Sequence, residues 1–253
     1  MVLQKDANIK LINTINEKKD ILSNFGLESL IIKEFTQEFS RLTAKEFVEN
    51  ILVNELKAKY IIIGYDHHFG RNRAANIDDL KAFGEIYDFE VEEITAQDIN
   101  DVAVSSTKIR NALLEGSIET ANEFLNYNFI LTGEVVKGKG LGRTIDFPTA
   151  NLQIEEDYKL IPKQGVYVVK ALYKNTPYCG MMNIGTNPTV NGDKQTIEVH
   201  FFDLNESLYG AHLQVEILHR LRDEQKFESI DALKKQLYLD KQNALRFIID
   251  NVK

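Results

Sequence analysis

Residues 137–151 combine residue types that phosphate chemistry uses, and they read KGKGLGRTIDFPTAN. Glycines beside cations are typical of phosphate loops, because a chain without side chains can turn its N–H groups toward an anion. No Gly-Lys-Ser or Gly-Lys-Thr closes the stretch, so it is not a Walker loop, and its G-x-G-x-G spacing is not a dinucleotide fingerprint. The candidate phosphate-binding residues are Gly138, Lys139, Gly140, Gly142 and Arg143.

Thr149 and Asn151 follow the glycines and are two positions apart. In an extended chain their side-chain oxygens share one face. A hydroxyl and an amide oxygen are hard, neutral ligands, which suit a Mg²⁺ ion that already carries phosphate oxygens and waters. The stretch is therefore interpreted as a phosphate-binding loop with a cluster of cations, followed by two ligands for a metal ion. Taken alone, the residues also allow a glycine-rich hairpin with solvated cations.

A phosphoryl acceptor needs a general base, and Glu198 is the candidate. It lies in the run TIEVHFF, where alternation puts Ile197 and Val199 on one face and Glu198 on the other. Burial statistics alone favour the simpler interpretation, an ordinary solvated glutamate on an outward face.

A second candidate anion site lies in the stretch SSTKIRNAL. Ser105, Ser106 and Thr107 can cap a helix whose free N–H groups attract phosphate, and Lys108 and Arg110 add positive charge. From the residues alone, a plain helix cap is the simpler interpretation.

Metal sites built from cysteine and histidine are not favoured. Cys179 is the only cysteine, so the chain has no internal disulfide and no multi-cysteine metal site. His67 and His68 are adjacent, so on a strand they would point to opposite faces and be poorly placed to chelate one ion.

The net charge of the 253 residues is −8 at pH 7, and it is unevenly distributed. Residues 1–125 hold 14 Lys and Arg against 22 Asp and Glu, whereas residues 126–253 hold 16 of each class. An acidic chain without a basic block argues against nucleic acid as the main partner. No apolar run approaches ~18 residues, and the start lacks the apolar core of a signal peptide. We therefore expect no membrane span and a cytoplasmic protein.

The elements that must position these residues differ between the two halves. In the first half, the patterns predict helices and strands in alternation, which favours a parallel α/β layer. Thr43 with Glu46 forms a capping-box pattern, and Asn76 is a helix cap. The predicted elements are a helical period over 9–22, a strand at 30–35, a helix from 43, a buried strand at 60–66, a helix from 76 and a strand at 89–94.

In the second half the period changes to short runs bounded by Gly, Pro and Asn, which indicate antiparallel strands in a barrel or sandwich. A helix is predicted to begin near Ser229 and to close the chain. The domain boundary is placed near Asn126, where charge and period both shift. The predicted strands are 128–136, 165–173, 178–184, 195–202 and 213–219.

Residues 126–253 resemble riboflavin kinase throughout. The resemblance implies a six-stranded antiparallel Greek-key β-barrel with a C-terminal helix, and transfer of the γ-phosphoryl group of ATP to the riboflavin 5′-hydroxyl, giving FMN. It assigns Thr149 and Asn151 to Mg²⁺-ATP and Glu198 to the base, and it implies flavin contacts at Asp203, Tyr209 and Arg222. The motifs that carry it, in order, are GKGLGRTIDFPTANL, GMMNIGTNPTV, TIEVHFFD, LYGAHLQVEIL and LRDEQKFESIDALKKQL.

Residues 1–125 resemble the FMN adenylyltransferase domain that bacteria fuse to this kinase, a Rossmann-like nucleotidyltransferase fold. The stretch GYDHHFGRNR looks like its flavin-side loop, and SSTKIRNAL looks like its nucleotide-binding helix start. The resemblance implies a nucleotide site at Ser105, Ser106, Thr107 and Arg110.

Two departures from the families stand out. Asp146 occupies a position where the kinase family usually has glycine, and an acid beside ATP phosphates is unfavourable unless it turns away or meets the metal. The adenylyltransferase family opens with a segment containing His-x-Gly-His, whose histidines contact the ATP phosphates, and no such motif occurs here. The sequence is thus expected to start partway into that domain, with at least one β-α unit of about 30 residues missing.

The leading hypothesis is a riboflavin kinase that uses riboflavin and Mg²⁺-ATP and carries an α/β adenylyltransferase remnant. One alternative is a flavin- or nucleotide-binding module without turnover, in which Asp146 is the residue that prevents catalysis. Another is that the native protein is longer and bifunctional, so that it also adenylylates FMN to FAD. No oligomeric state follows from the sequence.

Overall fold

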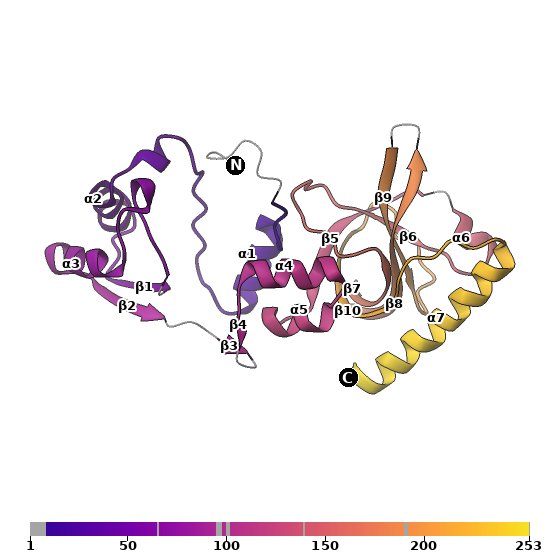
Figure 1. The fold of residues 1–253 in the computed structure, drawn as a ribbon. Helices are drawn as coiled ribbons and strands as arrows, with labels where there is room; N and C mark the ends of the chain where they lie inside the picture. Colours follow the sequence, from indigo (N-terminus) through magenta and orange to yellow (C-terminus); the bar gives the residue numbers. More distant parts are fainter. Residues whose placement is uncertain are drawn as a thin grey trace. The chain divides into compact units, whose positions relative to one another are not determined.

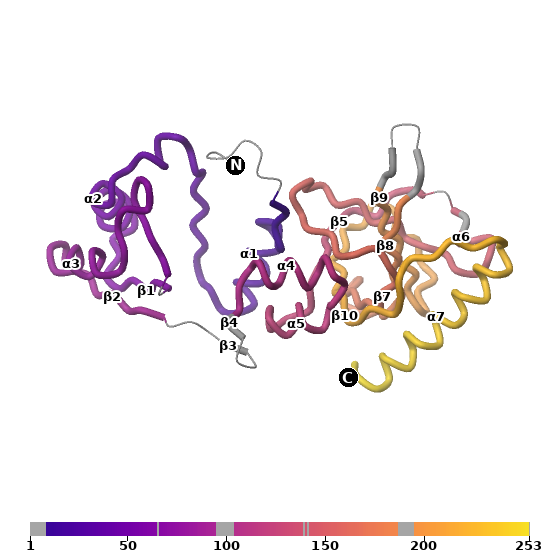
Figure 2. The backbone as a smooth tube through the Cα atoms, viewed as in Figure 1, coloured from indigo at the N-terminus to yellow at the C-terminus, as the bar shows by residue number. Residues whose placement is uncertain are grey.

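The computed structural model describes residues 9–64, 66–94, 98–99, 102–138, 140–189 and 192–252 (Figure 1). Within it the chain forms two compact units. One unit contains residues 29–104, and the other contains residues 9–28 together with the residues from 105 onward. Figure 2 traces how the stretch 9–28 contributes a helix to the second unit before the chain enters the first.

The first unit is a small parallel α/β layer, as predicted. Strand β1 (Tyr60–Gly64) pairs in parallel with β2 (Glu90–Ile94), and α3 (Ile77–Tyr87) lies between them in sequence. The side chain of Asn76 caps α3, and Thr43 with Glu46 forms the expected capping box. The other elements are η1 (Phe39–Arg41), α2 (Ala44–Glu46), the π-helical η2 (Phe47–Glu55), η3 (Arg71–Arg73), β3 (Asp98–Ile99) and β4 (Val102–Ala103).

Two sequence predictions for this unit were wrong. Residues 30–35 form no strand, and their apolar side chains are 39–63% exposed at Leu30, Ile31, Ile32 and Phe35. A strand requires a neighbour that completes its hydrogen bonds, and among the described residues β1 pairs only with β2. The strand β1 is also not buried as a whole, because Ile63 is its one buried residue.

Helix α1 (Ile15–Asn24) belongs to the second unit and is tied to it by a buried ion pair. The helical period was predicted from Ile9, but the helix begins after Thr14, which forms a capping box with Glu17. Glu17 Oε2 lies 2.5 Å from Lys159 Nζ, and the two side chains are 1% and 0% exposed. Burial lowers the pKa of Lys159, and the Glu17 carboxylate opposes that shift. Residues 142 positions apart thus fix α1 to the barrel.

The second unit is built on a closed antiparallel barrel with strand order β10-β5-β6-β9-β8-β7, which confirms the predicted fold class. The pattern analysis did not identify β6, which has only four residues. The strands of the barrel are β5 (Phe129–Val136), β6 (Ala150–Gln153), β7 (Gly165–Tyr173), β8 (Thr176–Thr189), β9 (Gly192–Phe201) and β10 (His212–Arg222). Its helices, besides α1, are α4 (Ser106–Glu115), α5 (Ile118–Leu125), α6 (Leu141–Thr144) and α7 (Ile230–Asn251).

Helix α7 begins after Ser229, as predicted, and covers one face of the barrel (Figure 1). An apolar cluster joins the helix to that face through Val166 and Val168 of β7, Met181 of β8 and Ala244 of α7. Because Asn183 is opposite Val166 and Glu198 is opposite Asn183, the polar residues of β8 and β9 lie on this same face. The face that carries the candidate base is therefore covered, not open to solvent as an ordinary outward strand face would be.

Candidate active site

Three strands bring the polar residues of the site together. Glu198 of β9 is directly opposite Asn151 of β6 on one side and Asn183 of β8 on the other. The Thr149 hydroxyl donates a hydrogen bond to Glu198 Oε2 over 3.2 Å. Directly opposite residues of antiparallel strands point to the same face, so Thr149, Asn151 and Glu198 form one half-buried cluster.

The glycines of the 137–151 stretch are required by close approaches in this cluster. A Cβ atom on Gly138 would lie 2.1 Å from Asn151 Nδ2, so the carboxamide occupies the space of a side chain. A Cβ atom on Gly142 would lie 2.1 Å from the Phe147 carbonyl oxygen. Gly140 has a φ of 73° and precedes α6, and Lys139 lies outside the described residues.

The donor set of this cluster fits a hard divalent cation. It offers a hydroxyl, a carboxamide oxygen and a nearby carboxylate, and oxygen donors of this kind are what Mg²⁺ prefers alongside phosphate and water. Contact with Gly138 restricts the Asn151 carboxamide, and the Glu198 bond orients the Thr149 hydroxyl.

Two cavities meet at Glu198. One has a volume of about 340 Å³ and lies between the α6 stretch, β8, the end of β10 and α7. Its walls are largely apolar and include Phe147, Phe227 and Leu237, a lining that suits a flat aromatic ring. The other, of about 620 Å³, lies beyond Asn151.

Arg143, a cation of the glycine stretch, contacts a residue that the resemblance assigned to flavin. Arg143 Nη2 donates to the Tyr209 hydroxyl over 3.0 Å, and its guanidinium lies 5.5 Å from the ring centroid. Both line a small hollow of about 80 Å³ that also includes Thr149. Arg143 and Tyr209 are thus brought together on one side of Thr149.

The other two residues that the resemblance assigned to flavin are placed differently. Arg222 lines the 340 Å³ cavity, but its guanidinium binds the buried Asp240 of α7, with Nη2 2.7 Å from Oδ2. Asp203 is exposed in the turn after β9, with a φ of 57°, and lines none of these three hollows.

Three residues of the site were missed by sequence reasoning. Asn183 and Glu224 line the 340 Å³ cavity, and a Cβ atom on Gly185 would lie 2.1 Å from Glu224 Oε1. His200 is buried, its Nδ1 lies 2.8 Å from the Pro148 carbonyl oxygen, and burial lowers its pKa. These side chains reach the site because of the register between strands and the packing of loops. Neither can be inferred from the residue pattern of one strand alone.

Asp146 turns away from the cluster. Its φ is 66°, in the left-handed region that favours glycine, and its carboxylate pairs with Lys234 of α7 over 2.6 Å. The side chain of Asp146 is 72% exposed and does not line the 340 Å³ cavity, although Ile145 and Phe147 on either side of it do.

We expect Asp146→Gly to leave the KM for ATP within about twofold of wild type, a difference of only ~0.4 kcal/mol. Removing a side chain from a left-handed position should also raise stability by about 1 kcal/mol at most. Steady-state kinetics and thermal unfolding check both. Lys234→Met is the matched control, because it removes the same ion pair without changing the backbone. A clear fall in KM for Asp146→Gly alone would mean that the carboxylate acts on the nucleotide.

The upstream stretch starts a helix, as predicted. Ser105 is the N-cap of α4, and its Oγ accepts from the Lys108 amide over 3.3 Å. Arg110 Nε donates to the Lys10 carbonyl oxygen over 3.1 Å, while Ser106 and Thr107 are exposed in the first turn. His67 and His68 are both exposed, and the His67 ring stacks on Phe69.

The barrel belongs to a riboflavin kinase domain, since residues 125–248 match the family model described as riboflavin kinase. Residues 1–108 match the model described as FAD synthetase. The chain belongs to the bacterial bifunctional riboflavin kinase/FMN adenylyltransferase family.

Relatives support this assignment over most of the chain. The bifunctional riboflavin kinase/FMN adenylyltransferase of Escherichia coli K12 is 37% identical over 92% of this chain and 74% of its own length. The Listeria monocytogenes protein of the same description is 35% identical over 94% and 76%. A Streptococcus pneumoniae crystal structure described as a macrolide-efflux protein has a TM-score of 0.87 at 33% identity, covering 100% of this chain and 80% of that one. None of the described helices has the length and apolarity to span a membrane.

Proposed function

We propose that this chain transfers the γ-phosphoryl group of ATP to the 5′-hydroxyl of riboflavin, giving FMN and ADP. One observation carries the proposal: the cluster of Thr149, Asn151 and Glu198 lies at the edge of an apolar cavity that is large enough for a flavin ring. Phosphoryl transfer asks a protein mainly for positioning and electrostatic stabilisation, and this cluster supplies both.

In the proposed reaction riboflavin occupies the 340 Å³ cavity, with its ribityl chain directed at Glu198. Arg222 lines that cavity, whereas Tyr209 lies with Arg143 on the other side of Thr149 and is better placed for the nucleotide. Glu198 accepts the proton of the 5′-hydroxyl as the oxygen bonds to the γ-phosphorus. The bond from that phosphorus to the β,γ-bridging oxygen breaks, and the electron pair leaves with ADP.

Thr149 and Asn151 would hold the Mg²⁺ that accompanies ATP. When bound, the ion neutralises charge on the phosphate oxygens. The protein's own contribution is to keep the two donors on one face, with Gly138 leaving room for the carboxamide and Glu198 orienting the hydroxyl.

We expect the purified protein to convert riboflavin to FMN only when a hard divalent cation is present. Neutral oxygen donors such as Thr149 and Asn151 can bind a Mg²⁺ ion that carries phosphate oxygens, but they have no positive charge with which to take the place of the ion. The assay is incubation with riboflavin and Mg²⁺-ATP, followed by chromatographic separation of riboflavin, FMN and FAD. Undiminished turnover in excess EDTA would contradict the metal role. Flavin binding without any FMN formation would favour the alternative, a binding module without turnover.

We further propose that polypeptide 1–253 leaves FAD at background in the same assay. Adenylylation builds negative charge on the pyrophosphate leaving group, and donors already placed there are often the largest catalytic term. The sequence has no His-x-Gly-His, and its histidines are 67, 68, 200, 212 and 219. Arg110, a candidate substitute, already donates to the Lys10 carbonyl. FAD formed at a rate comparable to that of FMN, by protein free of host synthetase, would contradict this proposal.

A further inference from the structure

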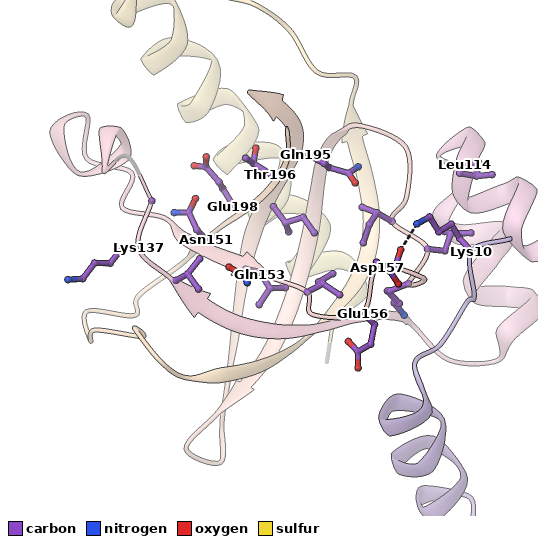
Figure 3. Close-up of a pocket in the computed structure, with 18 residues that line it drawn as sticks. Lys10, Leu114, Lys137, Asn151, Gln153, Glu156, Asp157, Gln195, Thr196 and Glu198 are labelled. Carbon is purple, nitrogen blue, oxygen red and sulfur yellow. Dashed lines mark hydrogen bonds between the residues drawn. The ribbon is translucent and has the colours of Figure 1, made fainter. Parts of the chain in front are cut away.

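The barrel is split between β6 and β9. These two strands pair only at Ala150 with Val199 and at Asn151 with Glu198, although β9 continues to pair with β8 as far as Gly192. The 620 Å³ cavity occupies the split, with β6 residues on one side and β9 residues on the other (Figure 3). It is therefore bounded by two strands whose facing edges do not pair with each other beyond Asn151.

The lining of the split changes along its length. Its neutral hydrogen-bonding side chains are Asn151 and Gln153 of β6 and Gln195 and Thr196 of β9; Asn151 and Thr196 lie beside Glu198 in Figure 3, and Gln195 lies farther along β9. Each carboxamide offers a donor and an acceptor, which suits a ring edge that carries alternating C=O and N–H groups. The rest of the lining is mainly aliphatic and includes Ile154, Leu160, Ile161, Ile197 and, from α4, Leu114.

The charges around the split disfavour an anionic ligand. Lys159 is bound to Glu17, and Lys10 donates to the Asp157 carbonyl oxygen. Lys137 points away from the cavity in Figure 3. Asp157 and Glu198 also line the cavity, whereas the carboxylate of Glu156 points away from it in Figure 3, so a phosphate here would lie close to two acidic residues.

We propose that the split is a second flavin-binding site, separate from the 340 Å³ cavity and selective for the uncharged flavin over its phosphate ester. The isoalloxazine ring has an imide edge for the carboxamides and an apolar dimethylbenzene end for the aliphatic wall. A volume of about 620 Å³ is in the range that encloses a ligand of this size. Adenine is polar on every edge and matches the aliphatic part less well. The proposal rests on the proposed function only in taking flavin as the ligand that the protein meets.

The test is equilibrium dialysis of the full chain against riboflavin and, separately, against FMN, without ATP. We expect two equivalents of riboflavin and one of FMN for the wild type. Ile154→Trp fills the split and should bind one equivalent of riboflavin. Leu233→Trp, the matched control, fills the 340 Å³ cavity and should also bind one, so that only the double variant binds none.

One equivalent of riboflavin in the wild type, unchanged by Ile154→Trp, would overturn the second site. If Ile154→Trp does not fold by circular dichroism, Gln153→Leu and Gln195→Leu replace it. These substitutions keep the volume of the side chains. Together they should weaken the affinity for the second equivalent of riboflavin by about tenfold or more, since each leaves polar groups of the ring unpaired. Unchanged affinity in that pair would equally refute the proposal. Two equivalents in a wild type that makes no FMN with Mg²⁺-ATP would reject the proposed function and leave the second site standing.

Discussion

Glu198→Gln is expected to lower kcat for FMN formation by ~10²–10⁴-fold, the usual effect of losing a general base. The amide keeps the shape of the carboxylate, so it still reaches the Thr149 hydroxyl and still lies between Asn151 and Asn183. It has no basic oxygen to take the proton of the riboflavin hydroxyl. Riboflavin affinity, measured by dialysis without ATP, should therefore change little while turnover falls.

Glu134→Gln is the matched control for that experiment. Glu134 is a half-buried carboxylate on β5 of the same barrel, and it lines none of the three hollows around Thr149 and Glu198. It should leave kcat unchanged. If Glu198→Gln retains kcat within about twofold of wild type, a gap of ~0.4 kcal/mol, Glu198 does not act as the base. A large loss of riboflavin affinity in Glu198→Gln would instead make the residue a binding contact.

Part of the candidate site has local sequence signals, although at Glu198 those signals alone favoured an ordinary solvated glutamate and the resemblance to riboflavin kinase assigned it as the base. Thr149 and Asn151 are two residues apart, and alternation in TIEVHFF separates Glu198 from Ile197 and Val199. What alternation cannot supply is the pairing partner of each strand. Asn183 lies beside Glu198 because of the register between β8 and β9, and Glu224 approaches Gly185 from the end of β10. Both require the closed barrel to be known first.

The secondary-structure predictions likewise succeeded where the signal is local and failed where the element depends on residues distant in the sequence. Helix starts at Thr43, Asn76 and Ser229 were predicted because a cap and its partner lie within three residues of each other. The strand predicted at 30–35 failed because apolar β-branched residues indicate a preference, whereas a strand exists only when a neighbour bonds to it.

The ion pair between Glu17 and Lys159 had no sequence signal, and it carries the largest stability effect that we expect. Glu17→Ala should lower the free energy of unfolding by about 3–5 kcal/mol, the cost of leaving a buried charge without its partner. Lys159 Nζ would keep the Ile12 carbonyl oxygen, the face of Phe129 and the electrostatic attraction of Glu156. The backbone amides of Thr14 and Thr132 would also lose their acceptor. Urea unfolding followed by far-UV circular dichroism measures the change, since the chain has no tryptophan.

Two further variants separate the ion pair from the helix that carries it. Asp20→Ala removes an exposed carboxylate from the same helix and should stay within about 0.5 kcal/mol of wild type. Adding Lys159→Met to Glu17→Ala removes the uncompensated cation, so the double variant should recover part of the loss instead of adding to it. If Glu17→Ala is as mild as Asp20→Ala, α1 is held by its other contacts. If the two substitutions simply add, the charges are not coupled, and the pair does not anchor residues 9–28 to the barrel.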